Sequence, residues 1–192
     1  MPNWCYTDYK VFGKRESLEK LESIMKELEN QEKPRVENGF GKLWLGCIVD
    51  YLGGKWEDIY CRGYITDHQL FDEELSFSTE TAWGEMNEFR EFLEKKIPDI
   101  RIYYMSEEPN MCDYYTNDRD GSVFHTRYYL DACDMDFEPE YFWDIQAVAD
   151  YLNEANLGIV FEPDEDSIKE KLEEYSEEHE DEYVELYKFE IE

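Results

Sequence analysis

Residues 60–79 read YCRGYITDHQLFDEELSFST, and this stretch decides the fold class of the 192-residue chain. Along Tyr60–Thr66, every second residue (Cys61, Gly63 and Ile65) falls on one face of an extended chain and the residues between them fall on the other. Leu75–Thr79 alternates in the same way. A period of two is typical of a strand with one buried face. The polar residues between the two segments form a connection, so the sequence predicts a pair of strands here.

Each side of this pair carries a predicted helix and a further strand. Tyr9–Phe12 ends at Gly13, and an alternating strand follows Pro98. The order strand, helix, strand, strand, helix, strand is that of an α+β, ferredoxin-like fold, with helices on one face of an antiparallel sheet. Glycines and Pro34 mark about 31–58 as an insertion. The apolar stripes of the two helices are Leu18, Leu21, Ile24, Met25 and Leu28, and Met86, Phe89, Leu93 and Ile97.

Two tyrosine-rich segments follow, Cys112–Thr116 and Phe124–Leu130, with a spacer rich in turn-forming residues between them. This pattern predicts an added hairpin. Beyond it, Tyr141–Asn153 and Ser167–Ser176 have helical periodicity, and Tyr183–Ile191 resembles a strand. We therefore expect a ferredoxin-like core over 1–130 and an acidic helical and strand extension over 131–192 that packs on it.

The net charge of −30 is the most informative bulk property. Residues 1–58 are nearly balanced at −2, whereas 59–159 carry −16 and 160–192 carry −12. Such a charge argues against binding to nucleic acid or to an anionic membrane and favours a basic partner. A solubility requirement alone does not predict the uneven distribution.

The sequence shows no pattern that is typical of a catalytic site or a metal-binding site. The five cysteines show no short repeated spacing, and the three histidines stand alone, so no zinc pattern is present. No phosphate-binding loop is present either. We expect no catalytic residue, no metal and no cofactor. The N-terminus lacks the features of a signal peptide, and no apolar run approaches the ~20 residues of a membrane span, so we expect a cytoplasmic protein with reduced thiols.

The opening Met1-Pro2-Asn3-Trp4-Cys5 and the strand ending at Gly13 resemble the YubB-type ferredoxin-like proteins of phages and plasmids. The likeness covers about residues 1–130. It departs at Gly54, where the family has threonine, and at Gly84-Glu85, where it has prolines. The resemblance implies a ferredoxin-like fold and a mobile-element origin, and it implies no activity. Three further segments are similar to the family: Leu52–Glu57, Phe77–Trp83 and Pro98–Ile100 with Glu107-Glu108.

Charge and resemblance together favour a non-catalytic phage or mobile-element inhibitor of a host defence nuclease, of the anti-CRISPR or anti-restriction kind. It would act as a DNA mimic, with carboxylates in place of phosphates. The alternative is a general protein-interaction module that uses exposed aromatic residues and is only incidentally acidic. The predicted partner-binding residues are Asp72, Glu73, Glu74, Glu107, Glu108, Asp134, Asp136, Glu138, Glu177, Glu178, Glu180, Asp181 and Glu182.

Trp4 receives a separate prediction. It directly precedes the first expected strand, so we expect it to anchor the core rather than bind a partner. On that placement its replacement by alanine would cost about 3–5 kcal/mol of stability.

Overall fold

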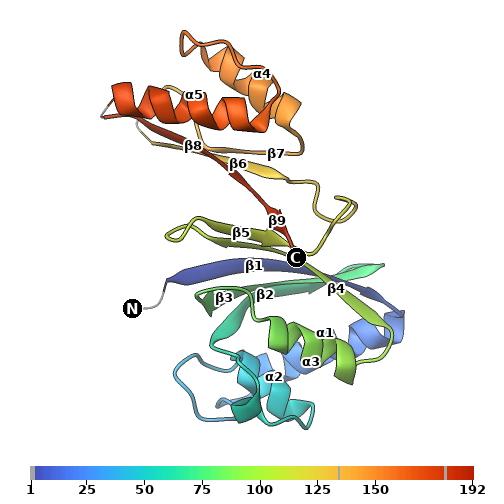
Figure 1. The fold of residues 1–192 in the computed structure, drawn as a ribbon. Helices are drawn as coiled ribbons and strands as arrows, with labels where there is room; N and C mark the ends of the chain where they lie inside the picture. The colour runs from blue at the N-terminus through green and yellow to red at the C-terminus, as the bar shows by residue number, and fades with distance from the viewer. Residues whose placement is uncertain (1–2, 134, 180) are drawn as a thin grey trace. The chain divides into compact units, whose positions relative to one another are not determined.

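The computed structural model describes residues 3–133, 135–179 and 181–192. They form two compact units that divide between Asn117 and Asp118 (Figure 1). The sequence-based prediction instead divides the chain after residue 130. Each unit combines helices with a β-sheet, so the predicted α+β class is confirmed.

The first unit is built on five antiparallel strands in the order β2-β3-β1-β4-β5. The predicted pair of strands at 60–79 is present as β2 and β3, which meet at a tight turn. The insertion contains α2 and the short 3-10 helix η1. In chain order the elements are β1 (Trp4–Gly13), α1 (Arg15–Glu29), α2 (Leu45–Tyr51), η1 (Trp56–Asp58), β2 (Gly63–Leu70), β3 (Glu74–Ala82), α3 (Asn87–Lys96), β4 (Ile100–Glu108) and β5 (Asp113–Thr116).

The two faces of this sheet differ because side chains alternate along each strand. On β1, Tyr9 and Val11 are buried and belong to the same core cluster as the apolar stripes of α1 and α3. Figure 1 shows the helices of this unit on that side of the sheet. We call the opposite side the outer face. Residues of β1 that point to it, such as Tyr6 and Asp8, are exposed.

Trp4 lies on the outer face and is only half-buried. Its ring makes edge contacts with Phe40 and Tyr64, each at a centroid distance of 6.5 Å. The prediction that Trp4 anchors the core is therefore wrong. The alternation of β1 explains why, since the neighbouring Cys5 takes the inward position and leaves Trp4 on the other side.

The predicted hairpin between Cys112–Thr116 and Phe124–Leu130 is also wrong. β5 forms a hairpin with the strand before it, β4, with Met105 opposite Thr116. The second tyrosine-rich segment enters β6, which belongs to another sheet. The four residues between β4 and β5 close a shorter loop than the spacer after Thr116, and a short connection favours pairing with the preceding strand.

The second unit is a small antiparallel sheet in the order β7-β6-β8, with two helices packed on one face (Figure 1). Its core contains Leu130, Val148, Leu172 and Leu186. Both helices begin at an aspartate whose side chain accepts a backbone N–H, which stabilises the first turn. The elements are β6 (Tyr128–Cys133), β7 (Glu140–Phe142), α4 (Ile145–Ala155), α5 (Glu165–Glu178), β8 (Tyr183–Lys188) and β9 (Glu190–Ile191).

Candidate binding surfaces

The acidic residues of the β2–β3 turn are presented to solvent. Asp72 and Glu73 are exposed, and Arg15 donates from its guanidinium to the backbone carbonyls of Phe71 and Asp72 at 2.6 and 3.2 Å. Glu74 begins β3, where it is half-buried and lies 3.8 Å from Lys10. The turn thus offers two exposed carboxylates, and the third is paired with a lysine.

Glu107 and Glu108 are neighbours in sequence, but the structure separates their roles. Glu108 is 1% exposed, and its carboxylate accepts hydrogen bonds from the backbone N–H of Met111 at 2.7 Å and from the side chain of Asn110 at 3.1 Å. It therefore holds the β4–β5 turn and does not contribute to an acidic surface. Glu107 is half-buried and points to the outer face.

The predicted acids of the second unit lie in two places. Asp136 and Glu138 are exposed in the loop between β6 and β7, and Asp134 lies outside the described residues. The other group lies around the end of α5, and Glu180 within it is also outside the described residues. Glu177, Glu178 and Asp181 are exposed there, whereas Glu182 is half-buried and accepts a hydrogen bond from Tyr175.

The exposed side of α5 extends this second group into a longer acidic surface. Six of its carboxylates are exposed and lie within about 140° of the helix circumference. The helix's two lysines are engaged elsewhere: Lys169 pairs with Glu165 at 2.9 Å and Lys171 donates to the carbonyl of Val160 at 2.8 Å. We call this surface the α5 acidic stripe; it consists of Asp166, Glu170, Glu173, Glu174, Glu177 and Glu178.

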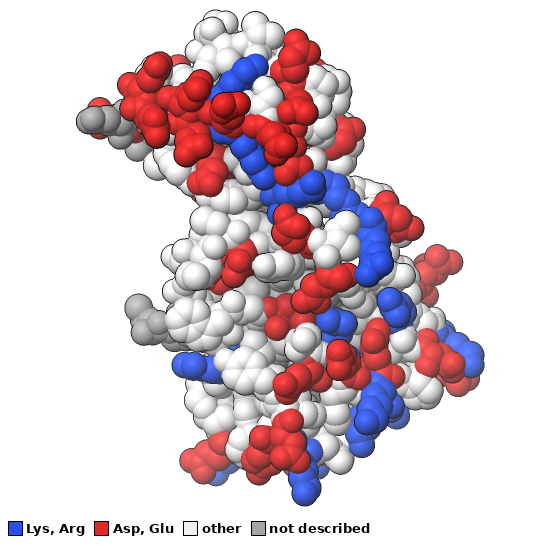
Figure 2. Space-filling model, viewed as in Figure 1, with Lys and Arg blue, Asp and Glu red and all other residues white. Residues whose placement is uncertain are grey.

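Four members of the stripe are absent from the predicted site, which includes only Glu177 and Glu178. The i, i+4 spacing of Asp166, Glu170 and Glu174 could have identified them, because residues at that spacing share a helix face. Figure 2 shows acidic side chains crowded over α5. The second unit has 25 acidic and five basic residues, a net charge of −20, whereas the first has 24 and 14, a net charge of −10.

A row of alternating tyrosines and glutamates crosses the outer face of the first unit. Strand register places Tyr64, Glu80, Tyr6, Glu107 and Tyr114 next to one another, with one residue from each of the five strands. Tyr6 is 52% exposed, whereas Tyr114 is buried. Tyr64 donates its hydroxyl to Glu80 at 2.5 Å. The row brings together one predicted site residue, Glu107, and four residues that sequence reasoning missed.

The small sheet of the second unit has a comparable surface on the side away from its helices. Strand register places Asp131 opposite Glu185, and Tyr129 opposite both Tyr141 and Tyr187. The three tyrosine rings line up at centroid distances of 4.7 and 6.4 Å. We call this surface the tyrosine face; it consists of Tyr129, Asp131, Tyr141, Tyr183, Glu185 and Tyr187.

Tyrosine hydroxyls are recurrent partners of the carboxylates in both units. A hydrogen bond to Glu80 raises the pKa of Tyr64 to about 12, and one to Glu182 raises that of Tyr175 to about 12. Burial, and then the bond to Glu185, raise the pKa of Tyr183 to about 12. These hydroxyls stay protonated at neutral pH and donate. A neutral donor orients a carboxylate without cancelling its charge, unlike a lysine or an arginine.

Glu85 and Arg90 form a largely buried ion pair in the first unit. Glu85 lies 3.1 Å from the Arg90 guanidinium and accepts the Tyr9 hydroxyl at 3.1 Å. Burial, and then the charge of Glu85, raise the pKa of Tyr9 well above its ordinary value. This network links the sheet to α3, and we assign it a structural role.

Thiol and metal chemistry gain no support from the geometry. Burial is the main cause that raises the pKa of Cys5 and raises that of Cys61 to about 11, which disfavours the reactive thiolate. Within residues 3–133, 135–179 and 181–192, no three His, Cys, Asp or Glu side chains are grouped so as to hold a metal ion. None of the helices in that same part of the chain is long and apolar enough to cross a bilayer.

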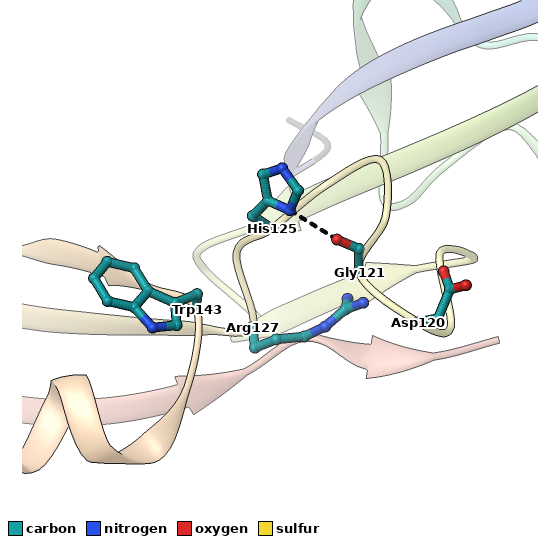
Figure 3. Close-up of a pocket in the computed structure, with 5 residues that line it drawn as sticks. All are labelled: Asp120, Gly121, His125, Arg127 and Trp143. Carbon is teal, nitrogen blue, oxygen red and sulfur yellow. Dashed lines mark hydrogen bonds between the residues drawn. The ribbon is translucent and has the colours of Figure 1, made fainter.

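A pocket of about 450 Å³ in the second unit has a mixed lining of Asp120, Gly121, His125, Arg127 and Trp143 (Figure 3). His125 bonds through Nδ1 to the carbonyl oxygen of Gly121 at 2.8 Å, and Arg127 donates to the carbonyl of Asp118 at 2.6 Å. Figure 3 shows Trp143 and Asp120 at opposite ends. These bonds of His125 and of Arg127 Nη2 stay within their own loop, and we do not assign the pocket a ligand.

Comparisons with known proteins assign no function, so the function is argued from the surfaces described above. No family model matches the chain, and neither the curated proteins nor the solved structures yield a match.

Proposed function

We propose that this protein is a non-catalytic inhibitor that occupies the basic nucleic-acid-binding groove of an enzyme. The α5 acidic stripe carries the proposal, since it presents six exposed carboxylates on one side of one helix. Its carboxylates would stand in for phosphates. The expected target is a host defence nuclease, such as a CRISPR effector or a restriction enzyme, in keeping with the resemblance to phage and plasmid proteins.

The charge spacing of the stripe supports mimicry. From Asp166 to Glu178 the helix rises about 18 Å at about 1.5 Å per residue, so the six carboxylates have a mean spacing of about 3.6 Å along the axis. One strand of duplex DNA carries a phosphate charge every ~3.4 Å. No residue of the stripe is in an ion pair with another described residue, so no cation in that part of the chain offsets the stripe. A basic groove shaped for DNA therefore meets a similar line of charge.

Orientation by tyrosine supports the same proposal. Binding of a flexible side chain costs conformational entropy, and a carboxylate that is already held avoids part of that cost. Tyr175 holds Glu182 beside the end of the stripe without neutralising it. The exposed Asp181 extends the same negative region beyond α5.

We also propose that the first unit has the ferredoxin-like arrangement. Its order β1, α1, β2, β3, α3, β4 and the sheet order β2-β3-β1-β4 support this assignment. β5 is then an addition at the β4 edge, and α2 lies in an insertion. Ferredoxin-like domains with basic and aromatic sheets bind RNA through this face, but here glutamates alternate with the tyrosines. That charge disfavours nucleic acid as the direct ligand.

A competition assay tests the proposed function. Purified CRISPR effectors and restriction nucleases would be incubated with labelled DNA and increasing amounts of this protein, at low and high salt. The wild type is expected to displace DNA, and more weakly as salt rises, because ions screen exposed charges. Replacement of Glu170, Glu173 and Glu177 together by glutamine should abolish displacement.

A matched control removes the same number of charges elsewhere. Glu16, Glu37 and Glu91 are exposed in the first unit, and their joint replacement by glutamine should leave displacement nearly intact. Equal loss in both triple variants would mean that net charge alone matters, and it would count against a defined mimic surface. A target that still binds DNA in the complex would refute mimicry.

The alternative function is a protein-interaction module based on exposed aromatic residues, and one observation favours it. Trp83 is 51% exposed, and its backbone has φ 76°, a left-handed conformation that is rare for a bulky residue. Such strain costs about 1–3 kcal/mol and is concentrated at functional sites. Binding through Trp83 would persist at high salt, whereas binding through the stripe would not. The salt series above separates the two.

A further inference from the structure

The tyrosine face contains a like-charge pair that needs an explanation. Asp131 on β6 lies directly opposite Glu185 on β8. Side chains in this relation have Cβ atoms about 4.5–5.5 Å apart, and like charges there destabilise a sheet. No lysine or arginine in the described part of the chain forms an ion pair with either residue. The sheet thus retains an unfavourable pair without an internal cation.

Tyrosine hydroxyls hold one oxygen of each carboxylate and leave the other available. Tyr183 and Tyr187 both donate to Oε2 of Glu185, at 2.5 and 2.6 Å, and Tyr129 donates to Oδ1 of Asp131 at 3.4 Å. The remaining oxygens, Oε1 of Glu185 and Oδ2 of Asp131, receive no hydrogen bond from the described residues. Two oriented, uncompensated acceptors therefore lie side by side on adjacent strands.

Aromatic rings flank these acceptors. Tyr141, Tyr129 and Tyr187 form a row one register step away, and Tyr141 and Tyr183 are 43% and 39% exposed. A guanidinium stacks on aromatic rings and donates to carboxylates as a planar fork, whereas an ammonium is a strongly hydrated point charge. Paired carboxylate oxygens beside tyrosine rings thus suit arginine better than lysine.

We propose that the tyrosine face binds an arginine side chain presented by a basic partner. Charge complementarity carries this assignment, since arginine supplies the cation that the Asp131–Glu185 pair lacks. It deepens the proposed function and rests on it only in requiring that the partner be basic. The face lies on the opposite side of the small sheet from α5, so it is a second surface rather than a part of the stripe.

An NMR titration of the full chain tests this directly and needs no identified partner. The probe is a blocked Gly-Arg-Gly peptide, with a citrulline peptide as its neutral isostere and a Gly-Lys-Gly peptide for comparison. The arginine peptide is expected to shift the amide signals of β6 and β8, the citrulline peptide to shift none of them, and the lysine peptide to bind more weakly. Glu185→Gln should weaken arginine binding about tenfold or more.

Two further variants sharpen the result. Glu154→Gln removes one exposed charge from α4, outside both surfaces, and should leave the arginine peptide's affinity unchanged. Tyr187→Phe retains the ring but loses one donor to Glu185, so it should fold normally and bind more weakly. Equal effects of Glu185→Gln and Glu154→Gln, or shifts confined to α5, would each overturn the proposal. Equal binding of the lysine peptide, or the same β6 and β8 shifts with Ca²⁺ alone, would also overturn it. The stripe's displacement of DNA is measured separately and can fail or succeed independently.

Discussion

Replacement of Glu108 by alanine should destabilise the first unit by about 2–4 kcal/mol, although the sequence marks this residue as a partner-binding acid. The carboxylate is buried and accepts two hydrogen bonds of ordinary length, from Met111 at 2.7 Å and Asn110 at 3.1 Å. Hydrogen bonds to a charged group contribute about 1.5–3 kcal/mol each. Two such bonds sum to about 3–6 kcal/mol, and we expect a smaller loss because the exposed Met111 can recover some hydration when its N–H is released.

The measurement is urea unfolding followed by tryptophan fluorescence, since four of the five tryptophans belong to the first unit. Glu107→Ala is the matched control, because it removes the same group from the adjacent, half-buried position on the outer face. We expect it to change stability by less than about 1 kcal/mol. The reasoning is refuted if the two variants have equal midpoints and slopes, or if Glu108→Ala keeps its stability and loses only partner binding.

Three further predictions concern packing, capping and pH. Gly46→Ala should destabilise the first unit by about 1–3 kcal/mol, because a Cβ there would lie 2.3 Å from the Trp44 ring. A thermal melt measures this loss of stability, and an unchanged melting temperature would contradict the prediction. Asp164→Ala should cost about 1 kcal/mol in urea unfolding by removing the side chain that caps α5 at 2.9 Å, whereas Asp164→Asn should retain most of the cap. Partial burial raises the pKa of Glu165, but bonds to Lys188 and Lys169 outweigh this effect and lower the pKa overall. The stability that Glu165 contributes is therefore present above the ordinary glutamate pKa. It is lost as pH falls through the lowered pKa of the folded state. The stability gap between wild type and Glu165→Gln should therefore shrink between pH 7 and pH 3 in thermal melts, and a constant gap would refute this.

Several elements of the fold follow from local pattern alone. The alternation within residues 60–79 predicts β2 and β3, and their turn is short enough to pair them. The apolar stripes predict α1 and α3, because residues at helical spacing share one face and need a core to pack on. The strand-like segment Tyr183–Ile191 is present as β8 and β9, with a break at Phe189. These features depend only on residues close together in the chain.

Strand pairing across longer connections could not be predicted in this way. β5 and β6 have similar tyrosine-rich sequences, yet β5 pairs with β4, and β6 pairs with β7 and β8. The choice depends on the free energy of whole sheets and not on the segment itself. Glu107 and Glu108 show the same limit at the level of one residue, since alternation distinguishes their faces only once the strand's orientation is known.

The residues alone show the amount of negative charge, its concentration in the later part of the chain and the abundance of tyrosine. How these groups combine on a surface depends on the pairing of strands in the folded chain. The row on the outer face takes one residue from each of five strands: Tyr64, Glu80, Tyr6, Glu107 and Tyr114. Asp131 lies opposite Glu185, which is more than fifty positions later in the sequence. A shift of one residue in register would move either set to the opposite face of its sheet. Composition therefore predicts an acidic, aromatic protein, whereas strand register decides which carboxylates are held by tyrosines and which surface a cation could occupy.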